Sequence, residues 1–409
     1  MATEQPLAPS VSASATGDPE KTMHELEQAM SNSKLQNTSF VPDPVVEKTE
    51  VSGNADGAVA GTVTNGAAVT NGTAEKTEPA FDTTLPLSSK DGPVKTPLRA
   101  PLESSKPKVR PELTTDQQEK YNKFLATVEA WTEVPNSLEA GASKSPIEEH
   151  ERMYMTRDCL LRYLRADKWN LSAAETRLRN TLSWRREFGV DTKLTPEYMS
   201  IENETGKQLI VGWDNEGRPC QIMRPSKQNT ERGPRQIEHL VFMLERSIDL
   251  MPAGQETLTL QINFAETKAG QGATLAQGRQ TLWILQNHYP ERLGRALITN
   301  VPWMIWGFFK LITPFIDPLT KEKIKFNEDS KVHVPPEQLL KECGGLVEFE
   351  YDHAQYWPAL NKLAEQKRAE RKARWEKAGK RVGEYENYLK GGQEESLADI
   401  EKKSAATAA

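Results

Sequence analysis

The chain has 409 residues, of which 27% are charged and 37% are hydrophobic, and its 52 basic and 58 acidic residues give a net charge of −6. This length leaves room for a large buried core and more than one domain. The acidic balance argues against a general nucleic-acid binder, which is usually basic, but it is compatible with a local basic patch for anionic lipid.

The cysteines and the apolar runs indicate the compartment. Three cysteines, Cys159, Cys220 and Cys343, are scattered along the chain, which predicts a reducing environment without a disulfide framework. The first residues lack the basic and apolar regions of a secretory signal. No run of about 20 apolar residues could cross a bilayer. We therefore expect a soluble, cytoplasmic protein whose contact with membranes is peripheral.

Residues 1–110 are rich in Ser, Thr, Ala, Gly, Pro and Glu and carry few large apolar side chains. Such a segment cannot bury enough surface to offset its chain entropy, so we expect a disordered tail. The repeated Thr-Asn-Gly stretch within residues 53–73 is of low complexity. A plain linker explains this composition better than a regulatory tail with phosphosites.

Residues 113–195 are expected to form a small helical subdomain. Thr115–Gln118 has the pattern of a capping box and precedes apolar residues at helical spacing. Ser145–Glu148, with a proline at the expected first helical position, and Ser172–Glu175 predict two further helix starts. The last of these helices is expected to stop at Gly189.

Residues 198–357 show short strands separated by helices. Strands are expected at 208–213, 218–224, 257–264, 295–301 and 322–326, and helices at about 237–251, 273–288 and 303–313. Strands that alternate with helices imply crossover connections and a largely parallel sheet, so the predicted fold class is α/β. Residues 358–409 are expected to form one long charged helix and a tail. Within it, residues 362–381 carry nine Lys and Arg against three acidic residues, which indicates either weak attraction to anionic membranes or an ordinary solvated helix.

An enzyme is one alternative for an α/β protein. The chain contains no G-x-S-x-G, no G-x-x-x-x-G-K-[ST] and no G-x-G-x-x-G after a strand, and its six histidines lack metal-ligand spacing. Cys159 and Arg165 have the C-x₅-R spacing of a cysteine phosphatase, but the intervening residues predict a helix rather than a phosphate-binding loop. Catalysis is therefore disfavoured, and no cofactor or metal is expected.

The segment 302–314 is apolar on nearly every side and contains a single lysine. A helix that is hydrophobic all round must be buried or must meet lipid, and this one is too short to span a membrane. A core helix and a moving lid both fit that composition. The bulky aromatics, a central glycine and a proline at each end favour the lid.

Polar clusters flank this segment at residues 288–292 and 317–323. A carboxylate, an arginine, a hydroxyl and a lysine suit an inositol phosphate, because its phosphate needs cations and its ring hydroxyls need acceptors. A surface ion pair between Glu291 and Arg292 is the simpler explanation from spacing alone.

Several stretches between about 155 and 357 form a specific set of motifs: Leu160–Trp169, Trp184–Gly189, Tyr289–Gly294, Pro314–Ile324 and Gly344–Gly345. In these stretches the sequence resembles the CRAL-TRIO family, and in particular its fungal phosphatidylinositol transfer proteins. Glu202–Gly206, Phe242–Arg246 and Met251–Gly254 resemble the branch linked to azole and multidrug resistance. The resemblance implies a helical N-terminal subdomain followed by a lipid-binding domain with an apolar pocket. It also implies that one phospholipid, phosphatidylinositol, is held there and exchanged between membranes.

The same resemblance implies which residues bind the lipid. The headgroup contacts fall on Lys168, Glu291, Arg292, Thr320 and Lys323. The gate and acyl pocket fall on Trp303, Trp306, Phe308, Phe309, Leu311, Ile312 and Phe315.

Two departures from the family pattern affect these expectations. The position before Lys168 is basic in the best-known members and is Asp167 here, so a weaker or rearranged headgroup contact is expected. Residues 264–272 lack the family's phosphatidylcholine contact, which leaves a sterol as an alternative second lipid. A lipid-responsive adaptor that presents lipid to a lipid kinase is the alternative function.

Overall fold

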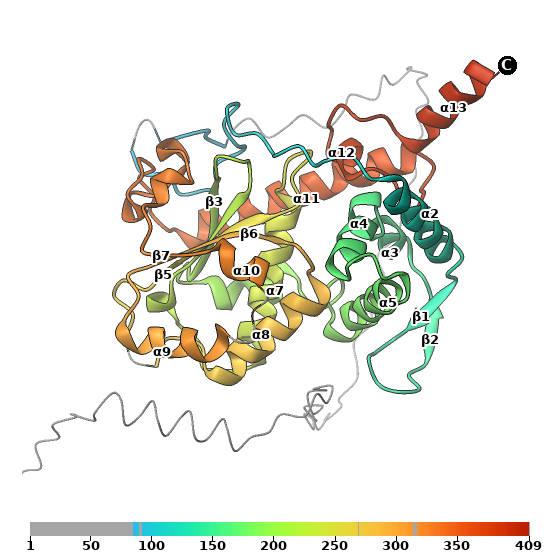
Figure 1. The fold of residues 1–409 in the computed structure, drawn as a ribbon. Helices are drawn as coiled ribbons and strands as arrows, with labels where there is room; N and C mark the ends of the chain where they lie inside the picture. Colours follow the sequence, from blue (N-terminus) through green and yellow to red (C-terminus); the bar gives the residue numbers. More distant parts are fainter. Residues whose placement is uncertain (1–84, 90–91, 269, 314–315, 317, 409) are drawn as a thin grey trace, which may run out of the picture. The chain divides into compact units, whose positions relative to one another are not determined.

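The computed structural model describes residues 85–89, 92–268, 270–313, 316 and 318–408. Residues 1–84, most of the expected disordered tail, lie outside this description. The chain forms a mixed α/β fold in which a central sheet is accompanied by helices (Figure 1). The predicted fold class is confirmed.

The described end of the expected tail packs on the sheet. Val94 forms a parallel bridge with Phe349, and the amide of Leu98, whose side chain is completely buried, donates to the carbonyl of Val211 over 2.8 Å. The predicted tail boundary at residue 110 is therefore wrong. Val94 and Leu98 bury their side chains in this segment, although its average composition is polar.

The helical part comprises α2 (Thr115–Glu129), α3 (Glu149–Tyr154), α4 (Arg157–Ala166), α5 (Leu171–Phe188) and α6 (Pro196–Ser200), with β1 (Glu133–Pro135) and β2 (Lys144–Pro146) between α2 and α3. Helix α5 ends at Gly189 as predicted, because glycine takes the left-handed conformation required there, with φ of 73°.

The starts of these helices differ from the predictions. Helix α2 is capped by Thr114, one residue earlier than expected, through a capping box with Gln117. Helix α5 is capped by Asn170, whose side chain accepts the amide of Ala173. The expected start at Ser145–Glu148 is wrong, because Pro146 lies in strand β2, paired with Glu133.

The sheet contains β3 (Gln208–Trp213), β4 (Pro219–Met223), β5 (Leu258–Asn263), β6 (Leu293–Thr299) and β7 (Ile324–Phe326), in this order. Strands β3 and β4 are antiparallel, and the remaining pairs are parallel. Helices α7 (Pro234–Asp249), α8 (Leu275–His288), α9 (Trp303–Ile312) and α10 (Pro318–Lys323) lie between or after the strands. Short 3₁₀ turns occur at 201–203, 225–227, 330–332, 336–338 and 341–343.

Two elements in the last third differ from expectation. The strand expected at 322–326 begins only at Ile324, because residues 318–323 form α10, in which a proline with its fixed φ is suited to the first turn. The expected single C-terminal helix is three helices, α11 (His353–Lys377), α12 (Glu386–Leu389) and α13 (Leu397–Ala408). Helix α11 ends where Gly379 adopts φ of 88°.

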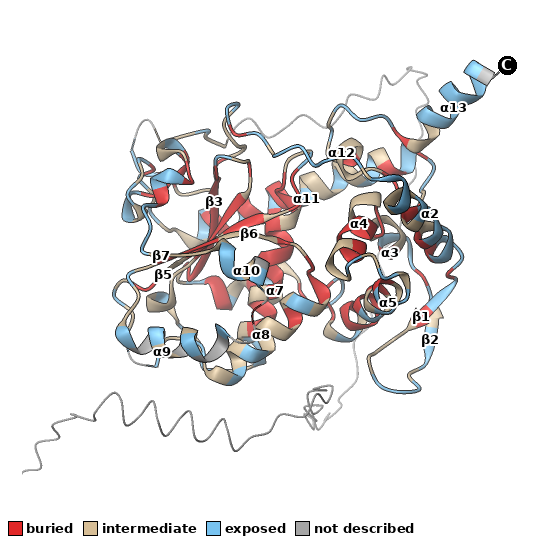
Figure 2. Ribbon diagram, viewed as in Figure 1, coloured by how far each residue is buried: buried red, intermediate tan, exposed pale blue. Residues whose placement is uncertain are grey.

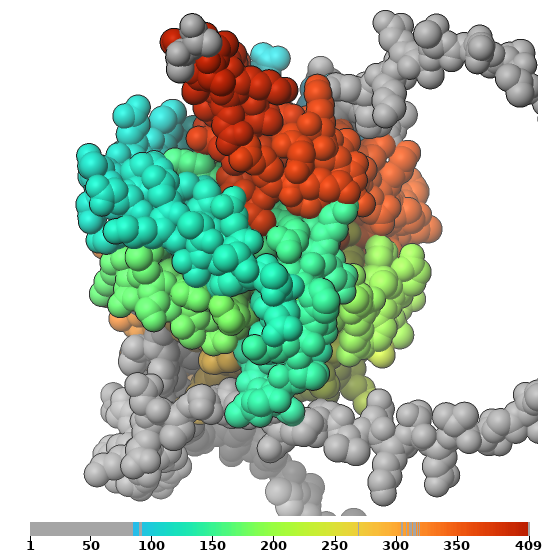
Figure 3. All heavy atoms as spheres, turned by 90° about the vertical axis from the view of Figure 1, so that its right-hand side faces the viewer, coloured from blue at the N-terminus to red at the C-terminus, as the bar shows by residue number. Residues whose placement is uncertain are grey.

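Buried residues concentrate in the strands and in the helices against them (Figure 2). One core lies around the sheet, α7 and α11, and a second lies among α2, α4 and α5. The segment after α11 packs beside the helical part (Figure 3), where the amide of Gly383 donates to the carbonyl of Met155 over 2.8 Å. None of the described helices has both the length and the hydropathy for a membrane crossing.

Candidate functional site

Helix α9 packs against the sheet through aromatic contacts. The ring centroid of Phe326 on β7 lies 4.6 Å from that of Trp306 and 4.9 Å from that of Phe309. Phe326 pairs with Ile298 of β6, which pairs with Ile262 of β5. Paired residues of neighbouring strands point to the same face, so α9 covers the face that carries these three side chains.

On the central strand, the side chains of the face covered by α9 are less completely buried than those of the opposite face. On β5, the central strand, Leu260 and Ile262 remain partly exposed, whereas Thr259, Gln261 and Asn263 on the other face are buried. Strands of a parallel sheet are normally buried on both faces. The exposed part of these side chains is therefore accessible apolar surface on the α9 side of the sheet.

Two of the predicted gate residues have exposed side-chain surface. The exposed fraction is 70% for Trp303 and 37% for Trp306, although the ring of Trp306 also contacts Phe326. Phe315 and the side chains of Phe308, Leu311 and Ile312 lie outside the described part of the structure.

The predicted headgroup residues come from three places in the fold. Lys168 is exposed in the turn after α4, and Glu291 and Arg292 connect α8 to β6. Thr320 and Lys323 lie on α10, which packs against β6. Lys168 and Glu291 both adopt left-handed backbone conformations, with φ of 52° and 57°, which are uncommon for residues other than glycine.

Glu291 and Arg292 do not pair with each other but bind different partners. The carboxylate of Glu291 accepts a hydrogen bond of 2.6 Å from Nε of Arg165. Arg292 is buried, donates to the carbonyl of Glu256 over 2.9 Å, and lies 3.9 Å from the carboxylate of Glu386. The expectation of a surface ion pair is therefore wrong.

These contacts belong to a buried charge network that the sequence did not reveal. Arg162 of α4 binds Glu256 over 2.9 Å and Glu386 of α12 over 2.6 Å, and Arg165 also binds Glu256. Burial alone would raise the pKa of Glu256, but Arg162, Arg165 and Arg110 lower it to about 2. The i, i+3 spacing of the two α4 arginines is a signal that they share a helix face, but nothing in the sequence connects them with Glu386.

The basic residues of α11 are largely engaged within the protein. Arg368 binds the buried carboxylate of Asp249 over 2.8 Å, and Arg371 binds its second oxygen. Lys372 lies 3.7 Å from Glu149. These contacts leave less basic surface for a membrane than the composition of residues 362–381 predicts.

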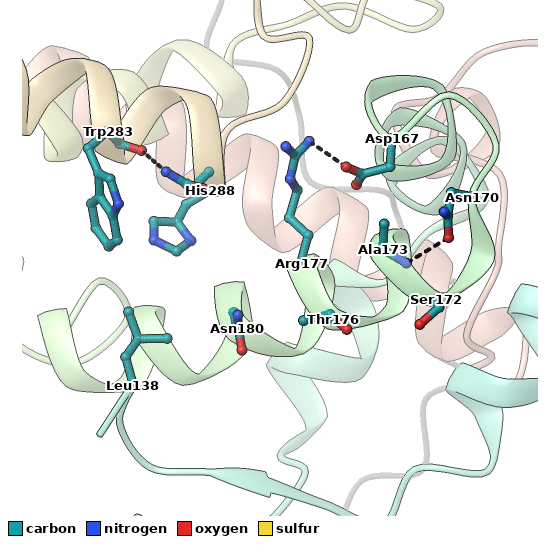
Figure 4. A pocket seen from close by; sticks show the side chains of 11 residues that line it. Leu138, Asp167, Asn170, Ser172, Ala173, Thr176, Arg177, Asn180, Trp283 and His288 are labelled. Carbon is teal, nitrogen blue, oxygen red and sulfur yellow. Dashed lines mark hydrogen bonds and ion pairs between the residues drawn. The ribbon is translucent and has the colours of Figure 1, made fainter. Parts of the chain in front are cut away.

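A cavity of about 480 Å³ lies between α5 and the end of α8 (Figure 4). Most of the side chains that line it are polar. They are Ser172, Ala173, Thr176, Arg177 and Asn180 on α5, Trp283, Asn287 and His288 on α8, and Leu138, Asp167 and Asn170 on connecting segments.

His288 is held in this wall by stacking and by one hydrogen bond. Its ring is parallel to that of Trp184, with centroids 4.3 Å apart, and its Nδ1 lies 3.1 Å from Oγ1 of Thr181. Oγ1 of Thr181 also lies within hydrogen-bond distance of the carbonyl of Arg177. Burial, with Arg177 and Arg185, lowers the pKa of His288 to about 3. The imidazole is therefore neutral.

Of the two carboxylate oxygens of Asp167, Oδ1 has a charged partner and Oδ2 has no hydrogen-bond partner among the described residues. Oδ1 lies 3.4 Å from Nη1 of Arg177. Burial raises the pKa of Asp167, while Arg177 lowers it. Among the described residues, neither Oδ2 of Asp167 nor Nε2 of His288 has a hydrogen-bond partner.

The chain matches two family models, the CRAL/TRIO domain over residues 203–345 and the CRAL/TRIO N-terminal domain over residues 120–180. It is 38% identical over 300 residues to the phosphatidylinositol transfer protein PDR17 of Saccharomyces cerevisiae, covering 69% of this chain and 86% of that protein. It is 31% identical over 212 residues to the SEC14 cytosolic factor of Kluyveromyces lactis, covering 46% of this chain and 70% of the other.

A CRAL-TRIO domain-containing protein of Schizosaccharomyces pombe is 48% identical over 282 residues. That match covers 69% of this chain but 28% of the relative, so the chain spans under a third of that protein's length.

Proposed function

Because the chain belongs to the CRAL-TRIO family, we propose that it holds one phosphatidylinositol molecule on the α9 side of its sheet and exchanges this lipid between membranes. The accessible apolar surface of Leu260 and Ile262, beneath a helix with exposed tryptophans, is the observation that carries the proposal. The Saccharomyces cerevisiae relative is named a phosphatidylinositol transfer protein, which supports the choice of lipid.

The energetics of acyl chains explain why such a protein needs a lid. Each CH₂ moved out of water gains about 0.8 kcal/mol, so two acyl chains cannot be released into water at a useful rate. Transfer from a bilayer into an equally apolar space is nearly neutral. In the proposal, α9 opens at the membrane, where the exposed rings of Trp303 and Trp306 suit the interface, and closes over the lipid afterwards.

The headgroup is assigned to Lys168, Glu291, Arg292, Thr320 and Lys323. The left-handed conformations of Lys168 and Glu291 support this assignment, because backbone strain of this kind clusters at functional sites. The guanidinium of Arg292 is buried, so its part in the proposal is to supply positive charge behind Glu291 rather than an exposed hydrogen bond.

Lipid analysis and a transfer assay test the proposal. Purified full-length chain should co-purify with about one phosphatidylinositol per molecule and should move labelled phosphatidylinositol from donor to acceptor vesicles. Sterol and phosphatidylcholine transfer are measured alongside. Stoichiometric lipid without transfer would indicate the adaptor function instead, and the absence of both would contradict the proposal.

A further inference from the structure

Residues 92–110 form a strap that leads from the sheet toward α2 (Figure 1). Nε2 of Gln338 donates to the carbonyl of Ala100 over 3.3 Å. The ammonium of Lys108 lies 3.2 Å from the carboxylate of Glu216, in the turn between β3 and β4. Both matched family models begin after this strap, at residues 120 and 203. The strap is therefore a packed part of the protein that lies outside the matched domains.

The last residue of the strap, Arg110, completes a closed ring of four alternating charges. Its Nε lies 2.5 Å from Oε1 of Glu256, and its Nη2 lies 3.9 Å from Oε2 of Glu291. Arg165 of α4 contacts the same two carboxylates, over 3.1 Å and 2.6 Å. Each glutamate of the ring thus has two guanidinium partners, and each guanidinium has two carboxylate partners.

The two carboxylates of the ring differ in how much they need those partners. The side chain of Glu256 is 8% exposed, whereas that of Glu291 is 28% exposed. An unpaired charge costs more when it is buried. Without Arg110, Oε1 of Glu256 loses its partner, so Arg165 is expected to turn toward Glu256 and to release Glu291.

Under the proposed function, the carboxylate of Glu291 accepts hydrogen bonds from ring hydroxyls of the headgroup. Its position then decides how well a hydroxylated headgroup is bound. We infer that Arg110 is a positioning residue for this step: it neutralises one oxygen of Glu256, so that Arg165 remains available to hold Glu291. The strap thereby sets the preference for a hydroxylated headgroup from outside the matched domains. This inference rests on the proposed function.

Competitive lipid uptake by the full-length chain tests the inference. The protein is incubated with phosphatidylcholine vesicles that contain equal amounts of phosphatidylinositol and phosphatidic acid, and it is then re-isolated for quantification of both bound lipids. Phosphatidic acid carries the phosphate and the acyl chains but no ring hydroxyls. A loss of positive charge alone therefore weakens the binding of both lipids, whereas a displaced Glu291 lowers the ratio of phosphatidylinositol to phosphatidic acid.

We expect Arg110→Ala and Arg110→Gln to lower this ratio by about fivefold or more, the effect of about one lost hydrogen bond. The glutamine variant keeps most of the length of the side chain and removes its charge. Lys108→Ala is the matched control, because it removes a cation from the same strap at a side chain that is 77% exposed. Its ratio should equal that of the wild type. Melting temperatures show that each variant is folded.

A double variant shows whether Arg110 acts through Glu291. Adding Arg110→Ala to Glu291→Gln should lower the ratio no further than Glu291→Gln alone, because coupled residues are not additive. Additive decreases, a wild-type ratio in both Arg110 variants, or an equal decrease in Lys108→Ala would each overturn the inference. If every protein acquires phosphatidylinositol at an unchanged ratio, only the inference fails. If the wild type acquires none, the proposed function fails and the inference fails with it.

Discussion

Arg162 in α4 and Glu386 at the start of α12 are 224 positions apart in the chain, yet their side chains form an ion pair of 2.6 Å in which Arg162 is buried and Glu386 is largely shielded from solvent. Glu386 also lies beside Arg292, close to the assigned headgroup site. The C-terminal segment is therefore an integral part of the helical core and not an appended tail.

Glu386→Ala should lower the free energy of unfolding by about 3–5 kcal/mol, because it leaves the buried guanidinium of Arg162 without one of its partners. Glu376→Ala is the control, since Glu376 forms an exposed pair with Lys372, and such pairs contribute about 0–1 kcal/mol. Urea unfolding of both variants measures the difference. Similar urea midpoints for Glu386→Ala and Glu376→Ala would show that the ion pair between Arg162 and Glu386 adds nothing to the free energy of unfolding.

Acid should destabilise the protein through Glu256. Its pKa is about 2 in the folded state against 4.5 for the free side chain, so the unfolded chain binds more protons between these values and stability falls as pH decreases from 4.5 toward 2. The loss from this carboxylate is on the order of 3 kcal/mol. Denaturation at pH 7, 5 and 3 should show a steeper decline for the wild type than for Glu256→Gln, and parallel declines would refute the assignment.

Trp303→Ala should reduce the rate of phosphatidylinositol transfer severalfold while changing the melting temperature little, because this ring is 70% exposed. Trp213→Ala is the contrasting variant: its side chain is buried in the sheet, and truncation should cost about 3–5 kcal/mol of stability. Melting and transfer are measured on the same preparations. A collapse of stability with an unchanged transfer rate per folded molecule would make α9 an ordinary core helix.

Lys168→Ala combined with Lys323→Ala should abolish phosphatidylinositol binding and leave the fold intact. Each charge-assisted phosphate contact contributes about 1.5–3 kcal/mol, so losing both should weaken binding by two orders of magnitude or more. Lys120→Ala, at a surface pair with Asp116, serves as the control. Normal transfer by a well-folded double variant would remove these lysines from the site.

Local signals in the sequence predicted much of the fold, because they depend on residues near one another. The strand at Leu258–Asn263 and the helix end at Gly189 follow from side-chain alternation and from glycine's access to positive φ. The pairing of Pro146 with Glu133 and the hydrogen bond from Leu98 to Val211 depend instead on tertiary contacts, which local sequence patterns do not specify.

The residues of the candidate site were likewise predictable from the sequence only in part. The family motif supplied Lys168 and Glu291, and the structure adds that both have strained backbones. The cavity residues Asn180 and His288 belong to different helices and carry no shared spacing. Their place in one cavity could not be predicted, because it arises only from the packing of α5 against α8.

The contact between Gly383 and Met155, together with the hydrogen bond from the amide of Arg157 to the carbonyl of Glu384, has a consequence for biosynthesis. A ribosome delivers α2 to α4 more than 200 residues before it delivers residues 383–386. Until then, Arg162 has no Glu386 to bind, and the groups at Met155 and Arg157 lack their native partners. The helical part is thus synthesised before the sheet but obtains its last native contacts after the sheet has been made. The nascent chain must remain protected from aggregation during that time.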